Sequence, residues 1–459
     1  MYFWLPTISI HSLVVVLSVL AYILTTRAER ERRRPPSIAI AWVLGMIALP
    51  YLVLPMYLMF GRRKLPRRRL RRQAARSFAG HWAQDLIESF GLPASSPASI
   101  HMHRDGEESA AALFSTIAGA TSRLDVCTYI LGDDAFGRET MQRLIERARS
   151  GVEVRLLLDG VGAIQLPKRC FDTLRSGGVE TAIFSPLFAR RTQGPRNLRN
   201  HRKMVIADAA RFWAGGRNLA AEYFTEVDGA PPWRDLTFDL HGAVAAAAAA
   251  QFECDWVAAG GKATSLCIAD APFAPPSGSQ AAAEAQFLPS GPDQSEDTVH
   301  ALLIDACFHA RDRMLAVTPY FVPDVILETA MRLAARRGVK IDLCIPASSN
   351  HKLADFARNR ALRALSQAGV NIHLLPYMSH AKGVVFDRAL ALSGSANLDS
   401  RSLLLNYECA VVFYGRAEID WLAGWIEDLI PNTAPFDSRA PTLMRDLCEG
   451  LLLTVAYQL

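Results

Sequence analysis

The chain has 459 residues, a length that excludes one ordinary domain and suits two or three. Half of the residues are hydrophobic, so a sizeable core can form. The eight cysteines form no CxxC pair and no Cys/His cluster with zinc spacing, so we expect no disulfides and no metal, and a reducing compartment fits. The net charge is only +5, but much of the basic charge lies before residue 75. This asymmetry indicates an anionic partner, either nucleic acid or anionic lipid.

Two uncharged segments, 8–26 and 38–60, come first in the chain. Each is long enough to cross a hydrocarbon core of about 30 Å as a helix. A cleaved signal peptide is the alternative for the first segment, but that segment lacks a basic start and a small-residue cleavage site, and a second span follows quickly. The sequence therefore predicts a membrane anchor over 1–72 with two transmembrane helices, the second one kinked or oblique because of Pro50 and Pro55.

Basic residues flank the two predicted spans unequally. Five arginines lie in the turn between the spans, and eight basic residues follow the second span. Positively charged loops stay in the cytoplasm, so the larger count predicts that the C-terminal part of the chain is cytoplasmic. The second basic cluster would then lie on the membrane surface, where each charge adds about 1 kcal/mol of attraction to anionic lipid. The alternative is that these residues only set the orientation of the chain.

From residue 100 onward, strand and helix patterns alternate, which indicates an α/β fold. The pattern occurs twice, because residues 148–159 and 335–346 both contain a helix end, a glycine and a buried strand. A stretch rich in Ala, Pro, Ser and Gly separates the two copies and is typical of a linker. The sequence thus predicts two similar mixed-sheet halves flanked by helices. They are a first half over 73–260, a linker over 261–296 and a second half over 297–459.

Each half contains the same motif, H-x-K-x4-D followed by G-[GS]-x-N. The motif begins at His201 in the first half and at His380 in the second. Agreement of the histidine, the lysine, the aspartate and the downstream asparagine in two places is a much stronger signal than one short motif. The predicted catalytic residues are His201, Lys203, Asp208, His380, Lys382 and Asp387.

The apolar triplets that follow each motif lysine are typical of strand interiors, and residues two apart on a strand share a face. The histidine and the lysine of each motif therefore point the same way. The two motif aspartates have the opposite parity and should brace a loop rather than do chemistry. The glycine-rich turns let the backbone pass close to a ligand. The candidate donors to phosphate oxygens in these turns are Asn218, Asn397 and Ser395.

Two imidazoles, two ammonium groups and two amides suit transfer at phosphorus. Such a transfer needs cations on the non-bridging oxygens and protons moved on and off the bridging ones. A neutral histidine can attack phosphorus and hold it covalently, and lysines can supply the positive charge without a metal. The alternative of two satisfied core histidines does not account for the symmetric pair.

A nucleophilic imidazole needs an acceptor at its second nitrogen. Each half has a candidate carboxylate downstream of its asparagine, Asp235 in the first and Glu408 in the second. We predict that Asp235 orients His201 and that Glu408 orients His380. Surface carboxylates without this role are the alternative.

One further pair of histidines stands outside these motifs. His101 and His103 flank Met102 on an expected strand and would share a face. No partner ligand is evident in the sequence, so we predict no metal site there.

The paired motifs resemble the HKD motifs of the phospholipase D superfamily, and the finer similarity is to its bacterial cardiolipin synthases. That finer similarity rests on residues 199–203, 318–323, 394–402 and 406–408, and the two N-terminal spans also fit. The resemblance implies two α/β halves whose motifs meet in one active site on a pseudo-twofold axis. It implies a multi-pass protein of the bacterial inner membrane. It also implies a reaction in which two phosphatidylglycerol molecules give cardiolipin and glycerol.

The resemblance further implies a role for each motif residue. His201 would attack phosphorus and form a phosphatidyl-histidine, while His380 would protonate the departing glycerol and then deprotonate the incoming hydroxyl. The near-symmetry of the sequence does not decide which histidine is the nucleophile, although the superfamily pattern favours the first. The phosphate oxygens would be held by Lys203, Lys382, Asn218 and Asn397.

Several alternatives stay open at this point. The chain could be a membrane-bound phospholipase D hydrolase, or a synthase that uses phosphatidylethanolamine as donor. A nuclease is disfavoured by the N-terminal hairpin and by the few aromatic residues in the basic segments. A non-catalytic lipid-binding protein should have lost a motif histidine or lysine, and all four are present. The expected partners are phosphatidylglycerol, other anionic phospholipids and the bilayer, with no nucleic acid and no cofactor.

Overall fold

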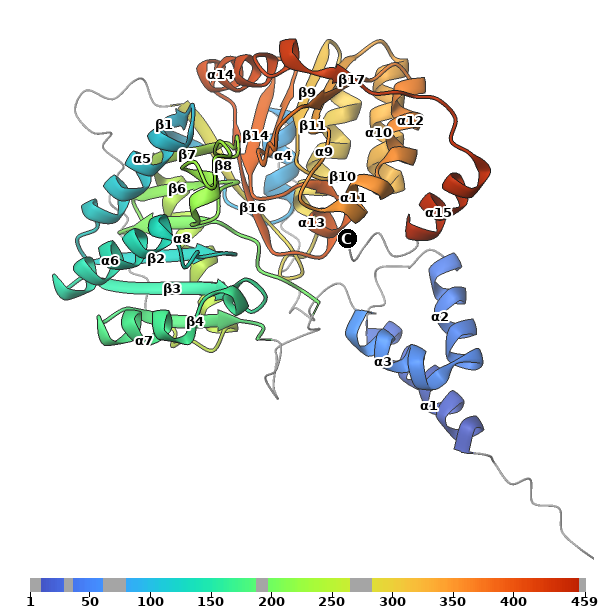
Figure 1. The fold of residues 1–459 in the computed structure, drawn as a ribbon, viewed down its shortest axis with the longest axis horizontal. Coiled ribbons are helices and arrows are strands. Elements are labelled where there is room, and N and C mark those ends of the chain that lie inside the picture. The colour runs from blue at the N-terminus through green and yellow to red at the C-terminus, as the bar shows by residue number, and fades with distance from the viewer. Residues whose placement is uncertain (1–9, 29–35, 61–79, 187–196, 265–282, 454–459) are drawn as a thin grey trace, which may run out of the picture.

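A mixed sheet of fifteen strands runs through both halves of the chain in the computed structural model (Figure 1). The structure describes residues 10–28, 36–60, 80–186, 197–264 and 283–453. A small second sheet pairs β10 (Phe321–Val322) with β15 (Leu398–Asp399).

The strand order of the large sheet is nearly symmetric about its centre. From the centre outward, the first half contributes β1 (Ser96–His103), β7 (Thr237–Gly242), β6 (Arg211–Gly215), β5 (Met204–Ala207), β2 (Arg123–Thr128), β3 (Glu153–Asp159) and β4 (Glu180–Phe184). The second half contributes β8 (Ala283–Ser290), β16 (Glu408–Phe413), β14 (Leu390–Gly394), β13 (Gly383–Phe386), β9 (Arg313–Val317), β11 (Lys340–Pro346), β12 (Asn371–Leu375) and β17 (Ala434–Pro435). β1 and β8 pair antiparallel at the centre, so the predicted duplication is confirmed and both halves share one continuous sheet.

The repeated segments fold alike because their local signals agree. α6 (Ala135–Arg149) and α10 (Val325–Arg336) each begin after an aspartate, Asp134 or Asp324, whose carboxylate accepts amides of the first turn. Each helix ends beside a glycine with a positive φ, +94° at Gly151 and +96° at Gly338. The buried strands β3 and β11 follow and pair parallel to β2 and β9, as the repeat predicted.

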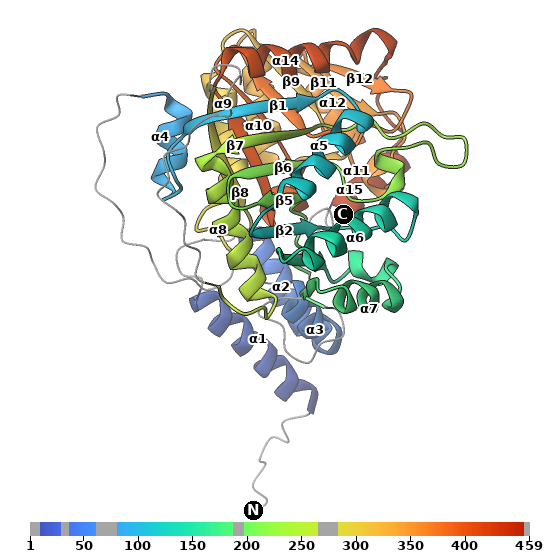
Figure 2. The same cartoon turned by 90° about the vertical axis from the view of Figure 1, so that its left-hand side faces the viewer.

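Helices cover both faces of the sheet, and Figure 2 shows this layering in the first half. There α5 (Gly106–Gly119), α6 and α7 (Lys168–Ser176) cover one face and α8 (Ala243–Ala258) covers the other. In the second half α9 (Thr298–His309), α10 and α12 (Asn359–Gln367) cover one face and α14 (Arg416–Glu427) covers the other. The remaining helices of the two halves are α4 (Trp82–Ser89), α11 (Lys352–Ala357), α13 (Ser400–Leu404), α15 (Leu443–Leu453) and the short η1 (Gly162–Gln165), η2 (Ala221–Tyr223) and η3 (Ile430–Asn432).

The two halves share a core beneath α8 and α14. The rings of Phe212, Phe238, Phe287 and Phe413, from four different strands, pack edge to face with centroids 5.2–6.3 Å apart. Small buried alanines of α8 let this helix lie close to the strands of the junction. Because the core crosses the junction, side chains from opposite halves can be held in fixed positions relative to one another.

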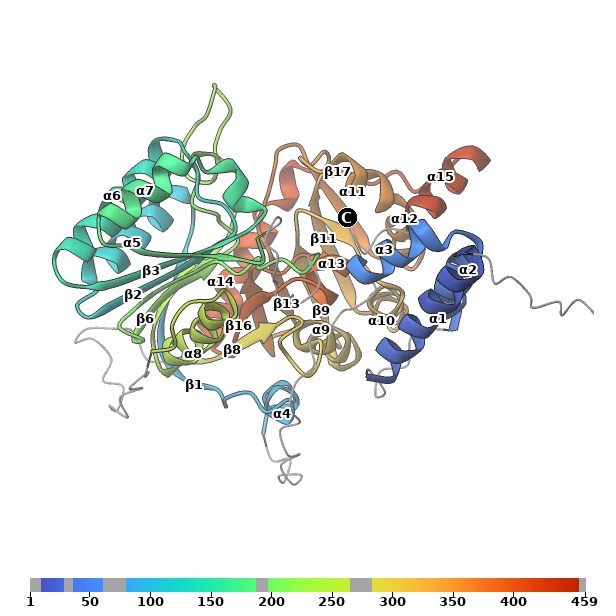
Figure 3. The same cartoon turned by 90° about the horizontal axis from the view of Figure 1, so that it is seen from below.

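The N-terminal helices form a group of their own at one side of the molecule (Figures 1 and 3). The predicted first span is α1 (Ile10–Ala28), but the predicted span 38–60 is not one helix, since α2 (Pro36–Ala48) ends before Leu49 and α3 (Pro50–Phe60) begins after it. Pro50 lacks an amide hydrogen and disfavours helical backbone at the preceding residue, which breaks the helix. In the described part of the chain, no helix combines the length and the apolar character needed to cross a bilayer.

Strand β8 lies inside the segment 261–296 that we predicted to be a linker. The prediction missed it because the strand begins with small and polar residues and contains Pro289, which is unusual in a central strand. Pro289 is tolerated because β1 pairs with β8 only at its start, Ala283–Ala285, so the far end of β8 needs only its ladder with β16. Residues 265–282 of the predicted linker lie outside the described residues.

Candidate active site

The two motif histidines lie in extended segments directly before β5 and β13. The apolar residues after each lysine form strand interiors, as predicted, with the motif histidine and lysine just ahead of the ladder. The His380 side chain is almost fully buried and that of His201 is 14% exposed. Both lysines are buried as well. The sheet therefore places the two motif imidazoles and the two motif amines in a buried part of the molecule.

Each histidine is held by a carboxylate from the opposite half. His201 Nδ1 lies 3.1 Å from Glu408 Oε1, and His380 Nδ1 lies 2.8 Å from Asp235 Oδ2. Both carboxylates are fully buried. The two predicted carboxylates thus do meet the motif histidines, but our prediction of Asp235 with His201 and of Glu408 with His380 was wrong.

Backbone bridges between the halves explain the crossed pairing. Asn200, just before His201, forms a parallel bridge with Tyr407, and the His201 amide donates to the Tyr407 carbonyl at 2.9 Å. The same arrangement recurs in the other half, where the His380 amide donates to the Arg234 carbonyl at 2.7 Å. Each carboxylate directly follows the bridging residue, so each is placed beside the histidine of the other half. The two motifs therefore form one composite site.

Burial sets the protonation of the four motif bases. It lowers the pKa of Lys203 to about 8 and the pKa of Lys382 to about 7, because an ammonium group loses hydration there. Burial, reinforced by Lys382, lowers the pKa of His380 to about 3. Burial and Lys203 also lower the pKa of His201. Both imidazoles are thus neutral at pH 7, and a neutral ring with Nδ1–H held by a carboxylate offers Nε2 as a nucleophile or base.

The two histidine–lysine pairs differ in detail. Lys203 Nζ donates to the backbone carbonyl of His201 at 2.8 Å. Lys382 Nζ donates to the backbone carbonyl of His380 at 2.5 Å in the same way, and it also lies against the ring of His380, 2.8 Å from Nδ1 and 3.1 Å from Nε2. The sequence motif is the same in both halves, so this asymmetry arises from the packing around it.

The motif aspartates brace loops, as their parity predicted. Asp208 accepts the backbone amides of residues 121–123 at 2.8 Å, and these bonds hold the pKa of Asp208 at about 2. Asp387 accepts the amides of residues 311–313 at 2.7–2.9 Å in the same way. Both residues have a positive φ of 50–55°. They fix the ends of β5 and β13 and contribute no group to the reacting space, so our inclusion of Asp208 and Asp387 among the catalytic residues was wrong.

The predicted phosphate donors are partly committed to the protein. Ser395 donates its hydroxyl to Glu408 at 2.5 Å, so it fixes this carboxylate rather than facing a ligand, and our assignment of Ser395 to phosphate binding was wrong. Asn218 donates one amide hydrogen to Tyr223 at 2.7 Å, and Asn397 donates one to Ser402 at 3.1 Å. Each asparagine amide has a second hydrogen.

The glycine-rich turns make room for protein rather than for a ligand. A Cβ at Gly216 would lie 2.1 Å from Asp235 Oδ1, and a Cβ at Gly394 would lie 2.2 Å from the carbonyl of Cys409. Gly216 therefore lets the carboxylate reach His380, and Gly394 lets β14 approach β16. The sequence predicted that the backbone at these glycines passes close to a ligand. In the structure the backbone passes close to Asp235 and Cys409 of the protein itself.

Sequence reasoning missed Arg202, which lies between the histidine and the lysine of the first motif. Its buried guanidinium donates to Asp255 at 2.5 Å, to Asp293 at 3.1 Å and to the carbonyl of Glu408 at 3.0 Å. Burial and the neighbouring Asp293 raise the pKa of Asp255. Burial alone would lower the pKa of Arg202, but Asp255 and Asp293 raise it, so the arginine stays charged. The second motif has Ala381 at this place, and that difference between the repeats was the signal available in the sequence.

Aromatic rings close the space around the histidines. The ring of Tyr129 lies 4.9 Å from that of His201, and the rings of Tyr223, Trp233 and Tyr320 lie 5.1–6.3 Å from that of His380. These rings exclude water from the imidazole faces and keep the local dielectric low. A low dielectric strengthens the attraction of an anionic phosphate for the two lysines.

Comparison with known proteins shows the family to which the chain belongs. The family model described as "Cardiolipin synthase, PLD-like domain" matches residues 113–230 and 303–430, and "Phospholipase_D-nuclease N-terminal" matches 14–62. Cardiolipin synthase A of Pseudomonas aeruginosa is 32% identical, with 95% of this chain and 93% of that protein covered, and the Pseudomonas syringae protein of the same name is 31% identical, with 81% of each covered. The crystal structure of phosphatidylserine synthase from Haemophilus influenzae aligns with a TM-score of 0.61 at 14% identity, over 82% of this chain and 100% of that one. The chain therefore belongs to the family of cardiolipin synthases with phospholipase D-like domains.

Proposed function

We propose that the enzyme transfers the phosphatidyl group of one phosphatidylglycerol molecule to a headgroup hydroxyl of a second, giving cardiolipin and glycerol. The observation that carries the proposal is the composite site. Two neutral histidines, each held at Nδ1 by a carboxylate of the opposite half, lie beside two buried lysines. This arrangement provides one nucleophile, one proton carrier and two cations for a phosphodiester.

In the first step, His201 Nε2 attacks phosphorus and forms a phosphorus–nitrogen bond. The bond from phosphorus to the oxygen of the headgroup glycerol breaks, and the protonated form of His380 gives its proton to that oxygen. His201 suits the attacking role because its ring is the more exposed one and Glu408 holds its Nδ1. The bound phosphodiester anion raises the proton affinity of His380, which prepares this ring to act as the acid.

In the second step, the headgroup hydroxyl of another lipid enters. His380, now neutral, takes the hydroxyl proton, and the new oxygen–phosphorus bond forms as the phosphorus–nitrogen bond breaks. Asp235 stabilises the imidazolium form of His380 in both steps, as the buried aspartate of a serine-protease triad does for its histidine.

The lysines and Asn218 hold the phosphate throughout. Lys203 and Lys382 have a pKa of about 8 and about 7 in the free site, and an anionic phosphate raises the pKa of both, so both bind as cations. The second amide hydrogen of Asn218 can donate to the same phosphate, whereas the Asn397 amide bonds to both Ser402 and Asp399. Two ammonium groups can neutralise the developing charge without a metal or another cofactor.

The surface of the N-terminal helices favours transfer of the phosphatidyl group to a lipid hydroxyl in preference to water. Tyr22, Met46 and Tyr57 pack together inside this N-terminal group, while its large apolar side chains face outward. An apolar surface of this kind suits insertion into a bilayer as an anchor. The anchor would hold the site against lipid headgroups at the bacterial inner membrane, with the catalytic halves in the cytoplasm. The side chains exposed by 41–61% include Leu13, Val16, Leu17, Leu20, Leu24, Leu44, Leu52 and Leu58.

The test is a reconstitution of the purified protein with phosphatidylglycerol in the presence of a chelator, with the lipids resolved by mass spectrometry. We expect cardiolipin and glycerol in equal amounts, and neither product from the His201→Ala or the His380→Ala variant. Phosphatidic acid as the sole product would make the enzyme a hydrolase. Product that forms only after phosphatidylethanolamine is added would change the donor and leave the histidine chemistry intact.

A further inference from the structure

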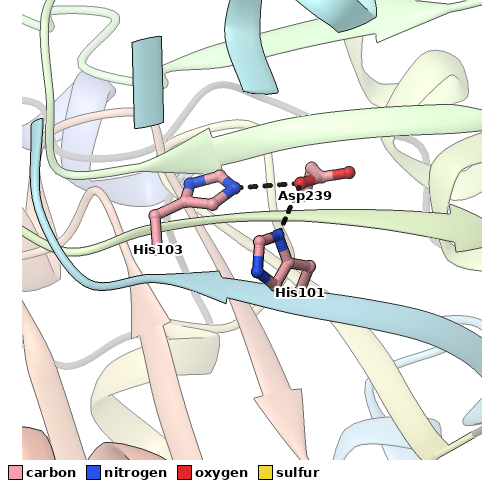
Figure 4. A group of neighbouring side chains, drawn as sticks. All are labelled: His101, His103 and Asp239. Atoms are coloured by element: carbon pink, nitrogen blue, oxygen red, sulfur yellow. Dashed lines mark hydrogen bonds and ion pairs between the residues drawn. The ribbon is translucent and has the colours of Figure 1, made fainter. Parts of the chain in front are cut away.

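A second cluster of ionisable side chains lies on β1 and β7, outside the residues assigned to the reaction (Figure 4). His101 lies directly opposite Asp239 in the antiparallel ladder, and His103 shares the face of His101 two residues further along β1. One nitrogen of each ring and one carboxylate oxygen of Asp239 lie within 4.8 Å of one another. Among the residues that the structure describes, this is the one group of three such side chains with metal-ligand spacing.

The hydrogen bonds of Thr237 determine which nitrogen of His103 carries the proton. The Thr237 hydroxyl donates to Ser109 at 2.6 Å and accepts from Arg217 at 3.0 Å, and His103 Nδ1 lies 3.0 Å from the same oxygen. A hydroxyl has one hydrogen and two acceptor positions, so Nδ1 of His103 is the donor here. The neutral ring therefore presents the lone pair of Nε2 to Asp239 Oδ1, 2.9 Å away.

His101 presents a second lone pair to the same oxygen. Its Nε2 lies 3.1 Å from Glu108 Oε1, which accepts the ring hydrogen, and its Nδ1 lies 3.7 Å from Asp239 Oδ1. Three acceptor atoms thus converge on one point. A single proton can join two of them and leaves the third unpaired, whereas a metal ion binds all three.

We propose that His101 Nδ1, His103 Nε2 and Asp239 Oδ1 bind a divalent transition-metal ion of the zinc class. For tetrahedral bonds of about 2.0–2.2 Å, ligand atoms lie roughly 3.4 Å apart, and the observed 2.9 and 3.7 Å bracket that separation. The carboxylate offers Oδ1 alone, because Arg211 lies 3.4 Å from Oδ2. The nitrogen set and the single carboxylate favour zinc over calcium or magnesium, which prefer oxygen ligands.

The surroundings match those of metal-binding histidines. Metal-bound histidines hold their second nitrogen on a carboxylate or another acceptor, and here Glu108 and Thr237 provide the two acceptors. The His101 side chain is 61% exposed, which gives an ion a path from solvent and leaves the fourth position to water. The ion ties β1 to β7 and, through Glu108, to the first turn of α5. β1 also pairs with β8, so the site stabilises the strand pair at the junction of the halves.

The experiment uses the full-length protein in detergent, purified without a histidine tag and stripped with a chelator. Zinc binding is measured by isothermal titration calorimetry, and Co²⁺ is added to a second sample to record visible absorption of a four-coordinate site. His101→Ala is the first variant because this side chain is exposed and its loss leaves the core intact. His373→Gln is the matched control, because His373 lies 2.8 Å from Asp342 across two neighbouring strands but belongs to no group of three.

We expect one zinc ion per chain in the wild type and in His373→Gln. His101→Ala should weaken zinc binding by more than the ~10–100-fold loss that removal of an outer partner causes, and it should abolish the Co²⁺ absorption. Glu108→Gln should weaken binding by about 10-fold. An unchanged zinc affinity in both His101→Ala and Asp239→Asn, or no zinc binding by the wild type, would overturn the proposal. Either result is independent of the phosphatidyl transfer, which uses none of these residues.

Discussion

At the scale of single residues, the two halves of the active site share a motif but not the same chemistry. Each motif lysine donates to the backbone carbonyl of its own histidine, and Lys382 also lies against the ring of His380. The H-x-K spacing predicted both pairs, since two residues apart on an extended segment share a face. It could not predict the difference, because that difference depends on which neighbours desolvate each lysine.

The crossed carboxylates lead to a prediction that separates the two steps of the reaction. Glu408→Gln and Asp235→Asn should each lower kcat by about 10²–10⁴-fold, because an amide holds the wrong imidazole tautomer. A phosphodiester with a nitrophenyl leaving group needs no acid, so it should rescue the first step of Asp235→Asn and not that of Glu408→Gln. Glu284→Gln, at an exposed position of β8, is the control. If the nitrophenyl substrate rescued the first step of Glu408→Gln and not that of Asp235→Asn, His380 would be the nucleophile and His201 the acid.

The buried lysine Lys382 predicts a pH dependence of stability. Its pKa is about 7 in the folded protein and near 10.4 in an unfolded chain, so between these values only the unfolded state binds the proton. Stability should therefore rise as pH increases from about 7 to 10, by at most about 1.4 kcal/mol per pH unit. Thermal unfolding from pH 7 to 9.5 should show this slope in the wild type and a smaller slope in Lys382→Met. An equal slope in both would contradict the assignment.

At the scale of elements, the bridges between the halves determine the pairing. Asn200 pairs with Tyr407 and Ser379 pairs with Arg234, so each β-strand that carries a motif begins beside a segment of the other half. Strand and helix positions could be predicted locally from periodicity and from helix ends such as Gly151 and Gly338. The carboxylate partner of each histidine could not be predicted in this way, because two equivalent carboxylates are available. The packing of one half against the other determines which carboxylate each histidine meets. β8 was missed for a local reason, its weak apolar pattern and Pro289.

Arg202 joins these elements, and its removal should uncouple them. Arg202→Met leaves the buried Asp255 and the partly buried Asp293 without their cation and should lower the free energy of unfolding by about 3–5 kcal/mol. Arg388→Met, at an exposed turn position of the second motif, should change it by less than about 0.5 kcal/mol. Denaturant unfolding of both variants measures the difference. Similar small effects would mean that the cluster around Arg202 does not hold the halves together.

Gly216 gives a test of the turn itself. A methyl group there would lie 2.1 Å from Asp235 Oδ1, so Gly216→Ala should push the carboxylate away from His380 and lower kcat by at least about 10²-fold. The variant should remain folded, as judged by circular dichroism. Gly424→Ala on α14 is the control, since an added methyl group there meets nothing within 4 Å. Full activity of Gly216→Ala would show that this glycine is not needed to place Asp235.

At the scale of the whole molecule, one sheet and one shared core make two repeats into a single enzyme. The sequence predicted the repeat, but the predicted linker contains β8, and we did not expect β1 and β8 to join the two halves at the centre of the sheet. The sequence predicted two spans from their apolar length and a kink in the second span from Pro50 and Pro55. It did not predict that the second segment would divide into two helices at Pro50, or that α2 and α3 would pack together around Tyr57.

The apolar surface of the N-terminal group predicts how the enzyme reaches lipid. Leu20→Glu, at a side chain 47% exposed on α1, should reduce binding to phosphatidylglycerol vesicles, because it removes about 1.5–3 kcal/mol of apolar burial and adds a charge. Val257→Glu on α8, at a side chain 40% exposed, should bind as the wild type does. Vesicle flotation measures both. Equal binding of the two variants would contradict an anchoring role for α1.

The central claim is that His201 carries the phosphatidyl group while His380, from the other half, moves the protons. The most direct measurement is mass spectrometry of peptides from enzyme that is denatured during turnover of phosphatidylglycerol. The denaturant is kept free of acid, because acid cleaves the phosphorus–nitrogen bond of the adduct. In the wild type and in Glu284→Gln, we expect an adduct on the peptide that contains His201. In His380→Asn, a nitrophenyl phosphodiester, whose leaving group needs no acid, should give more of this adduct because the second step is slowed. No adduct should form in His201→Ala. An adduct on the peptide that contains His380, or one that persists in His201→Ala, would contradict the account.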